Sequence, residues 1–204
     1  RSFATNLLNH FVLTETLRLA GALDSSSLVV SVGSGGMYGA RLDLAKLEAV
    51  DSRSHDGLVA YAQHKRAQAE LTRFWNSLGP GSPQAVLMHP GWVDSEGVRS
   101  ALPAFRATFR RWLRSPEEGA DTALWLAANR PARLASEGIW LDRRCDPEHA
   151  FGFTRGGADA AALVEFLRRR LDGIDRAGAA RPCPPAAARR GADRSRAVAQ
   201  ASAD

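Results

Sequence analysis

The chain has 204 residues, 45% of them hydrophobic and 24% charged, a balance typical of a globular protein of about one domain. No run of 18 or more uncharged apolar residues occurs, so no membrane-spanning helix is predicted. The formal net charge is +5, but six arginines and only two aspartates lie from residue 176 onward. The rest of the chain is therefore nearly neutral, and the charge says little about what it binds.

Cys145 and Cys183 are far apart and have no C-x-x-C partner, and no H-E-x-x-H motif is present. Neither a metal site nor a disulfide framework is predicted, and a reducing intracellular compartment such as the cytoplasm is expected. The opening stretch lacks the basic-then-apolar order of a signal peptide. Because the chain starts at Arg1, directly in a helical pattern, we expect it to begin inside a larger protein.

The first half of the chain alternates helical and strand patterns. Apolar residues at a period near 3.6 predict a helix over 2–22, and a β-branched apolar run predicts a buried strand over 27–33. The glycine-rich loop that follows has neither phosphate-loop signature. One or two helical turns are expected over 42–50, then a polar loop and a longer helix over 58–78.

The second half continues the alternation, with a Pro-Gly turn after the second strand and a basic, aromatic-rich segment over 96–115. The further predicted elements are strand 84–88, helix 115–129, strand 138–142 and helix 158–171. Strands alternating with helices indicate an α/β fold with a parallel sheet covered on both faces. We predict a folded domain over 1–173 and a disordered Ala/Arg/Pro-rich tail over 174–204.

Tyr61 and Lys65 are four residues apart at the start of a predicted helix, so both side chains lie on one face. A positive charge beside a phenol favours the phenolate, which allows such a pair to transfer protons near neutral pH. Ser34 follows the first strand and residues 90–95 follow the second. Since ligands bind beyond the carboxyl ends of parallel strands, we expect these groups to gather at one edge.

These residues together resemble the short-chain dehydrogenase/reductase (SDR) superfamily. Residues 6–14 resemble its N-x-x-x-H-F-x-L-T helix, residues 30–34 its serine-bearing strand end, and Tyr61 with Lys65 its Y-x-x-x-K motif. Residues 90–95 read P-G-W-V-D-S and resemble its P-G-x-V-x-T turn. The surrounding residues are most similar to the group called family member 12. The resemblance extends from the first residue to about residue 171 and implies a Rossmann-type, doubly wound parallel sheet.

The resemblance also implies roles for individual residues. Tyr61 would exchange a proton with the substrate oxygen, Ser34 would hold that oxygen, and Asn6 would anchor a water next to Lys65. Lys65 would also bind the nicotinamide ribose. The implied cofactor is NAD or NADP, and the implied partner is a small carbonyl or alcohol substrate. The remaining cofactor contacts would come from the second strand end: Pro90, Gly91, Val93 and Ser95.

One departure from the family pattern limits this expectation. The T-G-x-x-x-G-x-G turn that holds the pyrophosphate does not occur in the sequence. The chain thus corresponds to the carboxyl-terminal, catalytic half of the fold, and the strand over 27–33 is expected to be an open edge. The alternative to an active oxidoreductase is therefore a catalytically incompetent fragment or a binding remnant.

Other residues have simpler interpretations. His10, His64 and His89 fit no metal-ligand spacing and are expected to be packing residues. The arginines over 99–114 are expected on the solvated face of a mobile lid, with an acidic-substrate site as the alternative. The arginine-rich tail lacks interleaved aromatic residues, so no nucleic-acid partner is expected, although nucleic-acid or acidic-membrane binding stays open.

Overall fold

The computed structural model describes residues 2–48, 56–131 and 138–179. The chain divides into two units, residues 1–170 and 171–204, and the second unit is described only as far as residue 179. All of the sheet and the predicted site lie in the first unit. No helix within the described ranges has both the length and the apolar character needed to cross a bilayer.

The sheet has four strands in the order β1-β2-β3-β4. β1 (Leu28–Val32) and β2 (Gln84–Met88) pair in parallel, and β3 (Ile139–Leu141) pairs in parallel with β2. The three predicted strands and their parallel arrangement are confirmed. β4 (Arg144–Asp146) was not predicted and runs antiparallel to β3.

β1 stands at the end of the strand order, so its outer side is an edge of the sheet, as expected. Val32 at its carboxyl end is 50% exposed, although the predicted run is one of buried residues. Unpaired backbone N–H and C=O groups along such an edge can accept another strand.

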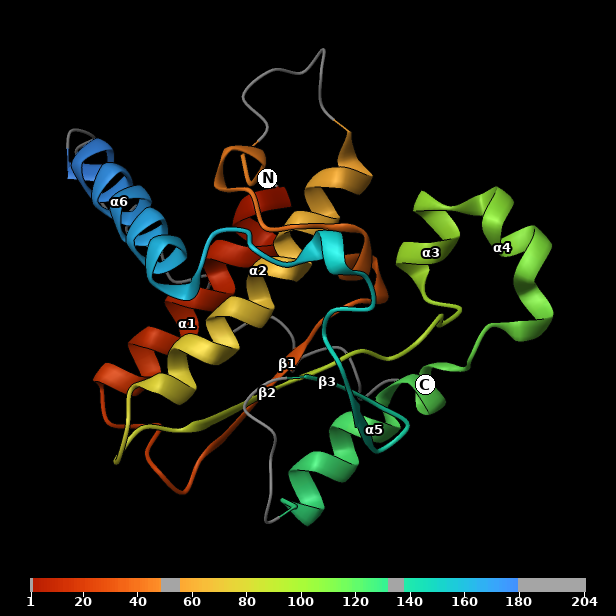
Figure 1. Cartoon of the computed structure of the whole chain (residues 1–204), viewed down its shortest axis with the longest axis horizontal. Helices are drawn as coiled ribbons and strands as arrows, with labels where there is room; N and C mark the ends of the chain where they lie inside the picture. The colour runs from red at the N-terminus through yellow and green to blue at the C-terminus, as the bar shows by residue number, and fades with distance from the viewer. Residues whose placement is uncertain (1, 49–55, 132–137, 180–204) are drawn as a thin grey trace, which may run out of the picture. The chain divides into compact units, whose positions relative to one another are not determined.

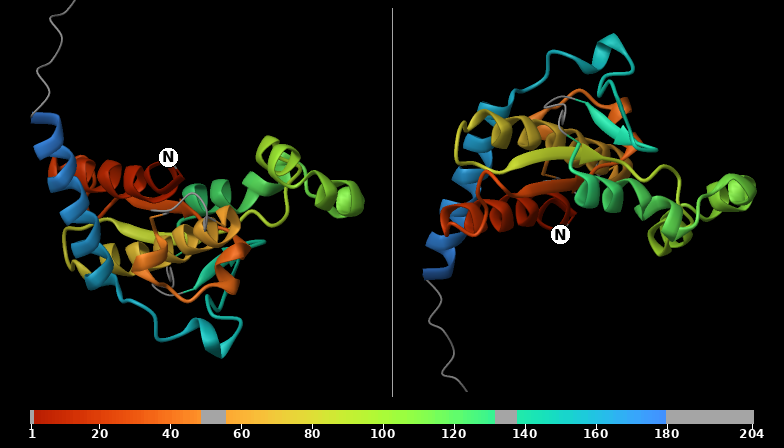
Figure 2. Two further views of the ribbon diagram at one scale, coloured as in Figure 1. Left: turned by 90° about the horizontal axis from the view of Figure 1, so that it is seen from above. Right: turned by 90° about the horizontal axis from the view of Figure 1, so that it is seen from below.

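Helices cover both faces of the sheet, as the alternation of elements predicts. α2 (Gly57–Ser77) and α5 (Pro116–Asn129) lie on opposite sides of the strands (Figure 2). α1 (Asn9–Leu19) follows a π-helical turn at Ala4–Leu8 and lies beside α2 (Figure 1). The remaining helices are α3 (Glu96–Ala101), α4 (Pro103–Phe109) and α6 (Ala160–Ala179).

The core forms because successive side chains of a strand point to opposite faces of the sheet. Leu87 and Ile139 pack with Met37 and Ala69 on the face covered by α2. On the other face, packing with Leu126 of α5, lie three buried side chains of β2 and β3: Val86, Met88 and Trp140. Each of these residues is at most 6% exposed, so the central strands β2 and β3 are buried on both faces.

Some predicted boundaries differ from the structure. The turns expected over 42–50 reduce to one 3-10 turn at Leu44–Lys46, and residues 49–55 lie outside the described ranges. α6 continues to Ala179, past the expected end at residue 171, so residues 174–179 are helical rather than part of the tail. The rest of the predicted tail, 180–204, is not described.

The start of α2 is set by Asp56. Its carboxylate accepts hydrogen bonds from the backbone N–H groups of Leu58 and Val59, at 2.8 and 3.3 Å. The first turn of a helix has no internal partners for these donors, so an aspartate cap stabilises it by about 1 kcal/mol. Tyr61 lies just after this capped turn.

Candidate functional site

The segment that follows β1 is attached to α2 by four consecutive side chains. This segment has little regular structure, so its backbone polar groups need other partners. Three of these side chains, an amide, an imidazole and a guanidinium, are themselves buried, and the fourth is a lysine. Gln63 bonds Arg41 O and Asp43 N, His64 bonds Leu47 O, Lys65 donates to Val32 O, and Arg66 donates to Met37 O and Ala40 O.

Ser34 and Tyr61 face the same point beside this segment. Ser34 caps the 3-10 turn Gly35–Gly39, and its Oγ accepts the N–H of Gly36 at 3.2 Å. A Cβ atom placed on Gly36 would lie 3.6 Å from Ser34 Oγ and 3.9 Å from the Tyr61 ring. The glycine therefore leaves space between the two predicted catalytic groups, which the structure brings together.

Lys65 lies next to Tyr61, as the four-residue spacing predicts. Its Nζ is 5.6 Å from the centroid of the Tyr61 ring and donates to Val32 O at 2.8 Å and to Gln68 Oε1 at 3.3 Å. Burial lowers the pKa of the Lys65 ammonium from its ordinary value, because desolvation disfavours the charged form. The ammonium is thus held at the end of β1 by two neutral oxygen atoms, a backbone carbonyl and a side-chain amide.

Gln68 connects Lys65 to Asn6, a link that the sequence does not reveal. The amide Nε2 of Gln68 donates to the backbone O of Asn6 at 2.8 Å, while its Oε1 accepts from Lys65. The side chain of Asn6 donates instead to Ser2 Oγ at 3.1 Å. Asn6 lies in a π-helical turn, a distortion that often occurs at functional sites. The only sequence signal for Gln68 is its helical spacing from Lys65.

The turn after β2 begins beside the carboxyl end of β1, because the last residue of β1, Val32, is paired with the last residue of β2, Met88. Gly91 has a φ of 75°, a conformation that favours glycine. Its position is also crowded, because a Cβ there would lie 2.8 Å from Arg114 Nε. Arg114 in turn makes a two-pronged ion pair with Asp142, at 2.5 and 2.7 Å.

Val93 and Ser95 are placed by backbone contacts in the same turn. Val93 forms a parallel bridge with Arg114, and its carbonyl accepts the N–H of Ser95 at 2.7 Å. Ser95 caps α3 by accepting the N–H of Val98 at 3.4 Å. A Cβ on Gly119 of α5 would lie 2.5 Å from the Val93 side chain, so α5 packs directly against the turn.

The three histidines named above have protein partners. His10 Nε2 is 3.1 Å from Ser31 Oγ, His64 Nε2 is 2.8 Å from Leu47 O, and His89 Nδ1 accepts the N–H of Gly91 at 3.2 Å. Burial lowers the pKa of His89, and the charge of Arg114 lowers it further. Among the residues that the structure describes, no group of three His, Cys, Asp or Glu residues could hold a metal ion.

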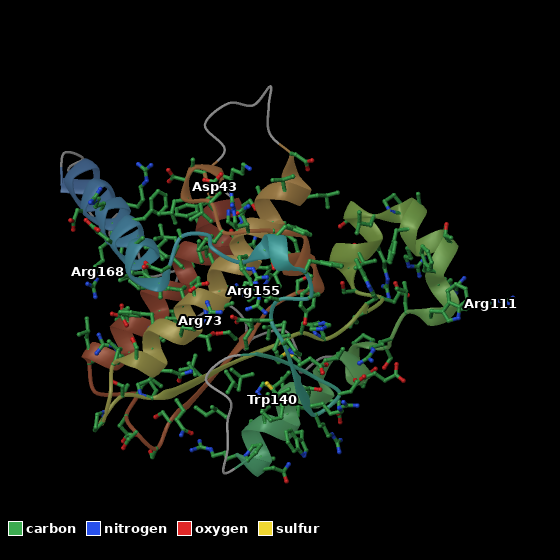
Figure 3. The ribbon with its side chains drawn as sticks, in the orientation of Figure 1. Asp43, Arg73, Arg111, Trp140, Arg155 and Arg168 are labelled. Carbon is green, nitrogen blue, oxygen red and sulfur yellow. The ribbon has the colours of Figure 1, made fainter. Side chains whose placement is uncertain are left out.

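A cavity of about 680 Å³ lies elsewhere, between α2 and the segment that joins β4 to α6. It is lined by Arg66, Glu70, Arg73 and Glu148 among others, but by none of the predicted catalytic residues. Arg73 pairs with both Glu70 and Glu148, and the buried Arg66 donates to Glu148 O at 2.9 Å. Figure 3 shows Arg73 near Arg155 in this region. The paired charges indicate a structural network.

Comparison with known proteins gives several related chains. Dehydrogenase/reductase SDR family member 12 from Bos taurus is 39% identical over 174 residues, which is 82% of this chain and 53% of that protein. The protein of the same name from Homo sapiens is 38% identical and covers 83% of this chain and 54% of its own length. Polyprenol dehydrogenase from Mus musculus is 36% identical over 140 residues, 63% of this chain and 41% of its own. No protein-family model matches the chain.

The fold and the site define a Rossmann-type α/β protein with a serine, a tyrosine and a lysine at the carboxyl edge of its parallel strands. With the relatives above, they show that the chain belongs to the short-chain dehydrogenase/reductase superfamily. The resemblance to the family member 12 group is confirmed as well. The chain spans about half the length of the curated relatives it matches.

The crowding at Gly91 is tested by comparing it with Gly21, which has a similar φ of 71° but nothing within 4 Å of a Cβ. Gly21→Ala should lower the free energy of unfolding by about 1–2 kcal/mol, the cost of the left-handed conformation. Gly91→Ala should cost roughly a further 1–3 kcal/mol, because the methyl group meets Arg114. Urea unfolding followed by circular dichroism measures both. Equal losses of unfolding free energy in the two variants would show that the Arg114 side chain moves aside without cost.

The environment of Lys65 is tested by its titration. The chain has only two lysines, Lys46 and Lys65. Their ¹³Cε NMR signals are therefore assigned with one variant, Lys46→Arg, in which only the signal of Lys65 is left. The signal of Lys65 should titrate below the ordinary lysine pKa of 10.5, because burial disfavours its charge. The folded state then binds fewer protons than the unfolded state, so stability rises with pH across that interval. A midpoint at or above 10.5 would contradict the burial of this ammonium.

Proposed function

We propose that the protein is an NAD(P)-dependent oxidoreductase that interconverts a carbonyl and an alcohol, with Tyr61 as the proton donor and acceptor. The observation that carries the proposal is the grouping of Ser34, Tyr61 and Lys65 at one edge of the sheet. The names of the relatives, dehydrogenase/reductase and polyprenol dehydrogenase, support the same class of reaction.

Tyr61 would give its hydroxyl proton to the substrate oxygen during reduction and take it back during oxidation. The ammonium of Lys65, 5.6 Å from the ring centroid, would stabilise the phenolate that forms. The hydroxyl of Ser34 accepts one hydrogen bond from Gly36 and, within the described ranges, donates none, so its proton would be available to the same substrate oxygen. The site would thus supply a proton from Tyr61, a hydrogen bond from Ser34 and the positive charge of Lys65, all close to where negative charge develops on oxygen.

The nicotinamide group of the cofactor would supply or accept the hydride. The donors of Lys65 fit a ribose hydroxyl, because the ammonium has three N–H groups and two acceptors among the described residues. Ser95 likewise accepts one hydrogen bond and donates none to the part of the chain that the structure describes, so its hydroxyl proton would be available to the cofactor. Pro90, Gly91 and Val93 would form the surface beside the nicotinamide ring. NAD and NADP are both compatible with these contacts.

The proposal predicts that Tyr61→Phe lowers kcat about a hundredfold or more, because the proton has no other donor at that position. The chain offers a matched control in Tyr38, the second of its two tyrosines, whose hydroxyl donates to Pro147 O at 3.1 Å. Tyr38→Phe should leave kcat nearly unchanged. Turnover is measured on aldehydes, ketones and alcohols with each nicotinamide cofactor, using the whole gene product. Equal activity of the two variants would disprove the role of Tyr61.

A second candidate is that the 204-residue chain by itself is a catalytically incompetent fragment or binding remnant that does not hold the nicotinamide cofactor. The free edge of β1 and the lack of a T-G-x-x-x-G-x-G motif in these residues favour it. Titration of NADH and NADPH against this chain, followed by cofactor fluorescence, separates the two candidates. The remnant predicts no saturation up to millimolar cofactor. Saturation in the micromolar range, lost in Lys65→Met and kept in Lys46→Met, would refute it.

A further inference from the structure

The turn after β2 and the helices that follow it carry four aromatic rings in contact. Consecutive ring centroids along Trp92, Phe105, Phe109 and Trp112 are 4.5, 4.8 and 5.9 Å apart. We call these four side chains the aromatic ridge. Trp92 is 55% exposed and Trp112 is 75% exposed. Contiguous exposed aromatic side chains of this kind mark a surface that contacts something outside the chain.

The ridge is anchored at its base and leaves its rings outside the core. Arg114 N donates to Trp92 O at 2.8 Å, and Asp94 N donates to Arg114 O at 2.9 Å, so the two ends of the segment lie side by side. Asp142, just after β3, fixes this base through its ion pair with Arg114. Within α4 no residue is buried. Figures 1 and 2 show α3 and α4 standing away from the sheet.

The charges around the ridge divide into two groups. Arg99 and Arg106 share the single carboxylate of Asp94, so one of their two positive charges is balanced there. Arg110 and Arg111, which belong to the 3-10 turn that includes Trp112, are exposed and have no ion pair among the described residues. Figure 3 shows Arg111 at the outer end of the segment. Two unbalanced cations therefore lie beside the most exposed ring of the ridge.

We propose that the aromatic ridge, together with Arg110 and Arg111, is a docking surface for an anionic lipid bilayer. Tryptophan is enriched at the membrane interface because its ring is apolar and its N–H is polar. Arginine beside it binds anionic headgroups, and each basic residue near such a surface contributes about 1 kcal/mol. An exposed apolar surface bordered by unpaired cations combines both contributions.

The same features argue against two other occupants. A second copy of the chain would bring the same two cations to the contact, which disfavours a symmetric pairing. Single-stranded nucleic acid stacks its bases on free aromatic rings, but Phe105 and Phe109 each already contact two other rings of the ridge. An anionic bilayer matches both the exposed aromatic rings of the ridge and the positive charges of Arg110 and Arg111. The inference does not depend on the proposed enzymatic activity.

The test is flotation of the 204-residue chain with vesicles of phosphatidylcholine alone and of phosphatidylcholine with phosphatidylserine. The chain should float with the anionic vesicles only, with a blue shift of tryptophan emission. Arg110→Gln with Arg111→Gln should weaken vesicle binding about tenfold or more, and Trp112→Ser should weaken it similarly. All three residues are exposed, so the urea midpoint of each variant should match that of the parent chain.

A matched control comes from another adjacent arginine pair, Arg169 and Arg170 of α6, which are exposed but paired with Glu165 and Glu48. Arg169→Gln with Arg170→Gln should leave vesicle binding nearly unchanged. The proposal is overturned if the chain ignores anionic vesicles, if it binds neutral vesicles equally, or if the Arg169 and Arg170 variant loses as much binding as the ridge variant. It is also overturned if the ridge variants change only self-association or binding to single-stranded DNA, measured by analytical ultracentrifugation.

Discussion

The structure depends on how α2 satisfies the backbone of the irregular segment after β1. Four consecutive side chains, residues 63–66, bond backbone groups between Val32 and Leu47. Buried carbonyl and N–H groups without partners are costly, and this segment has few partners of its own. Arg66, only 1% exposed, is the central member, because it donates to Met37 O, Ala40 O and Glu148 O. Removing one side of such a buried charged contact is strongly destabilising.

The chemistry of the site follows from this attachment. Ser34 stands at the start of the segment that Arg66 holds, and Tyr61 stands one helical turn before Lys65 and Arg66. One stretch of α2 therefore supplies both the phenol of Tyr61, which we propose as the proton donor, and the bonds that hold the segment after Ser34. The burial that lowers the pKa of Lys65 belongs to the same attachment, since Lys65 is one of the four side chains and its Nζ donates to Val32 O. The hydrogen bonds from α2 that hold the segment after β1 also position the candidate site, so a substitution that removes them should affect both stability and the geometry of the site.

Much of this could be predicted from the sequence where local pattern dominates. The β-branched run before Ser34 and the apolar run before His89 predicted β1 and β2 within a residue or two, because buried parallel strands need such residues. The spacing of Tyr61 and Lys65 predicted their contact, since helical geometry fixes it. β4 was missed because its tight turn uses Asp142 and Arg143 at positive φ, where asparagine and glycine are the usual signals.

The sequence by itself determined the α/β class, the parallel direction of the three predicted strands and the residues that meet at their carboxyl ends, because periodicity and strand direction are local or topological properties. The order of the strands in the sheet came only from the structure. Only the tertiary structure decided how those residues are held. The bridge from Lys65 through Gln68 to Asn6 joins positions distant in the chain, and so does the contact of Arg114 with Gly91. Hydrogen bonds of this kind depend on side-chain direction and distance in three dimensions, which no spacing along the chain specifies.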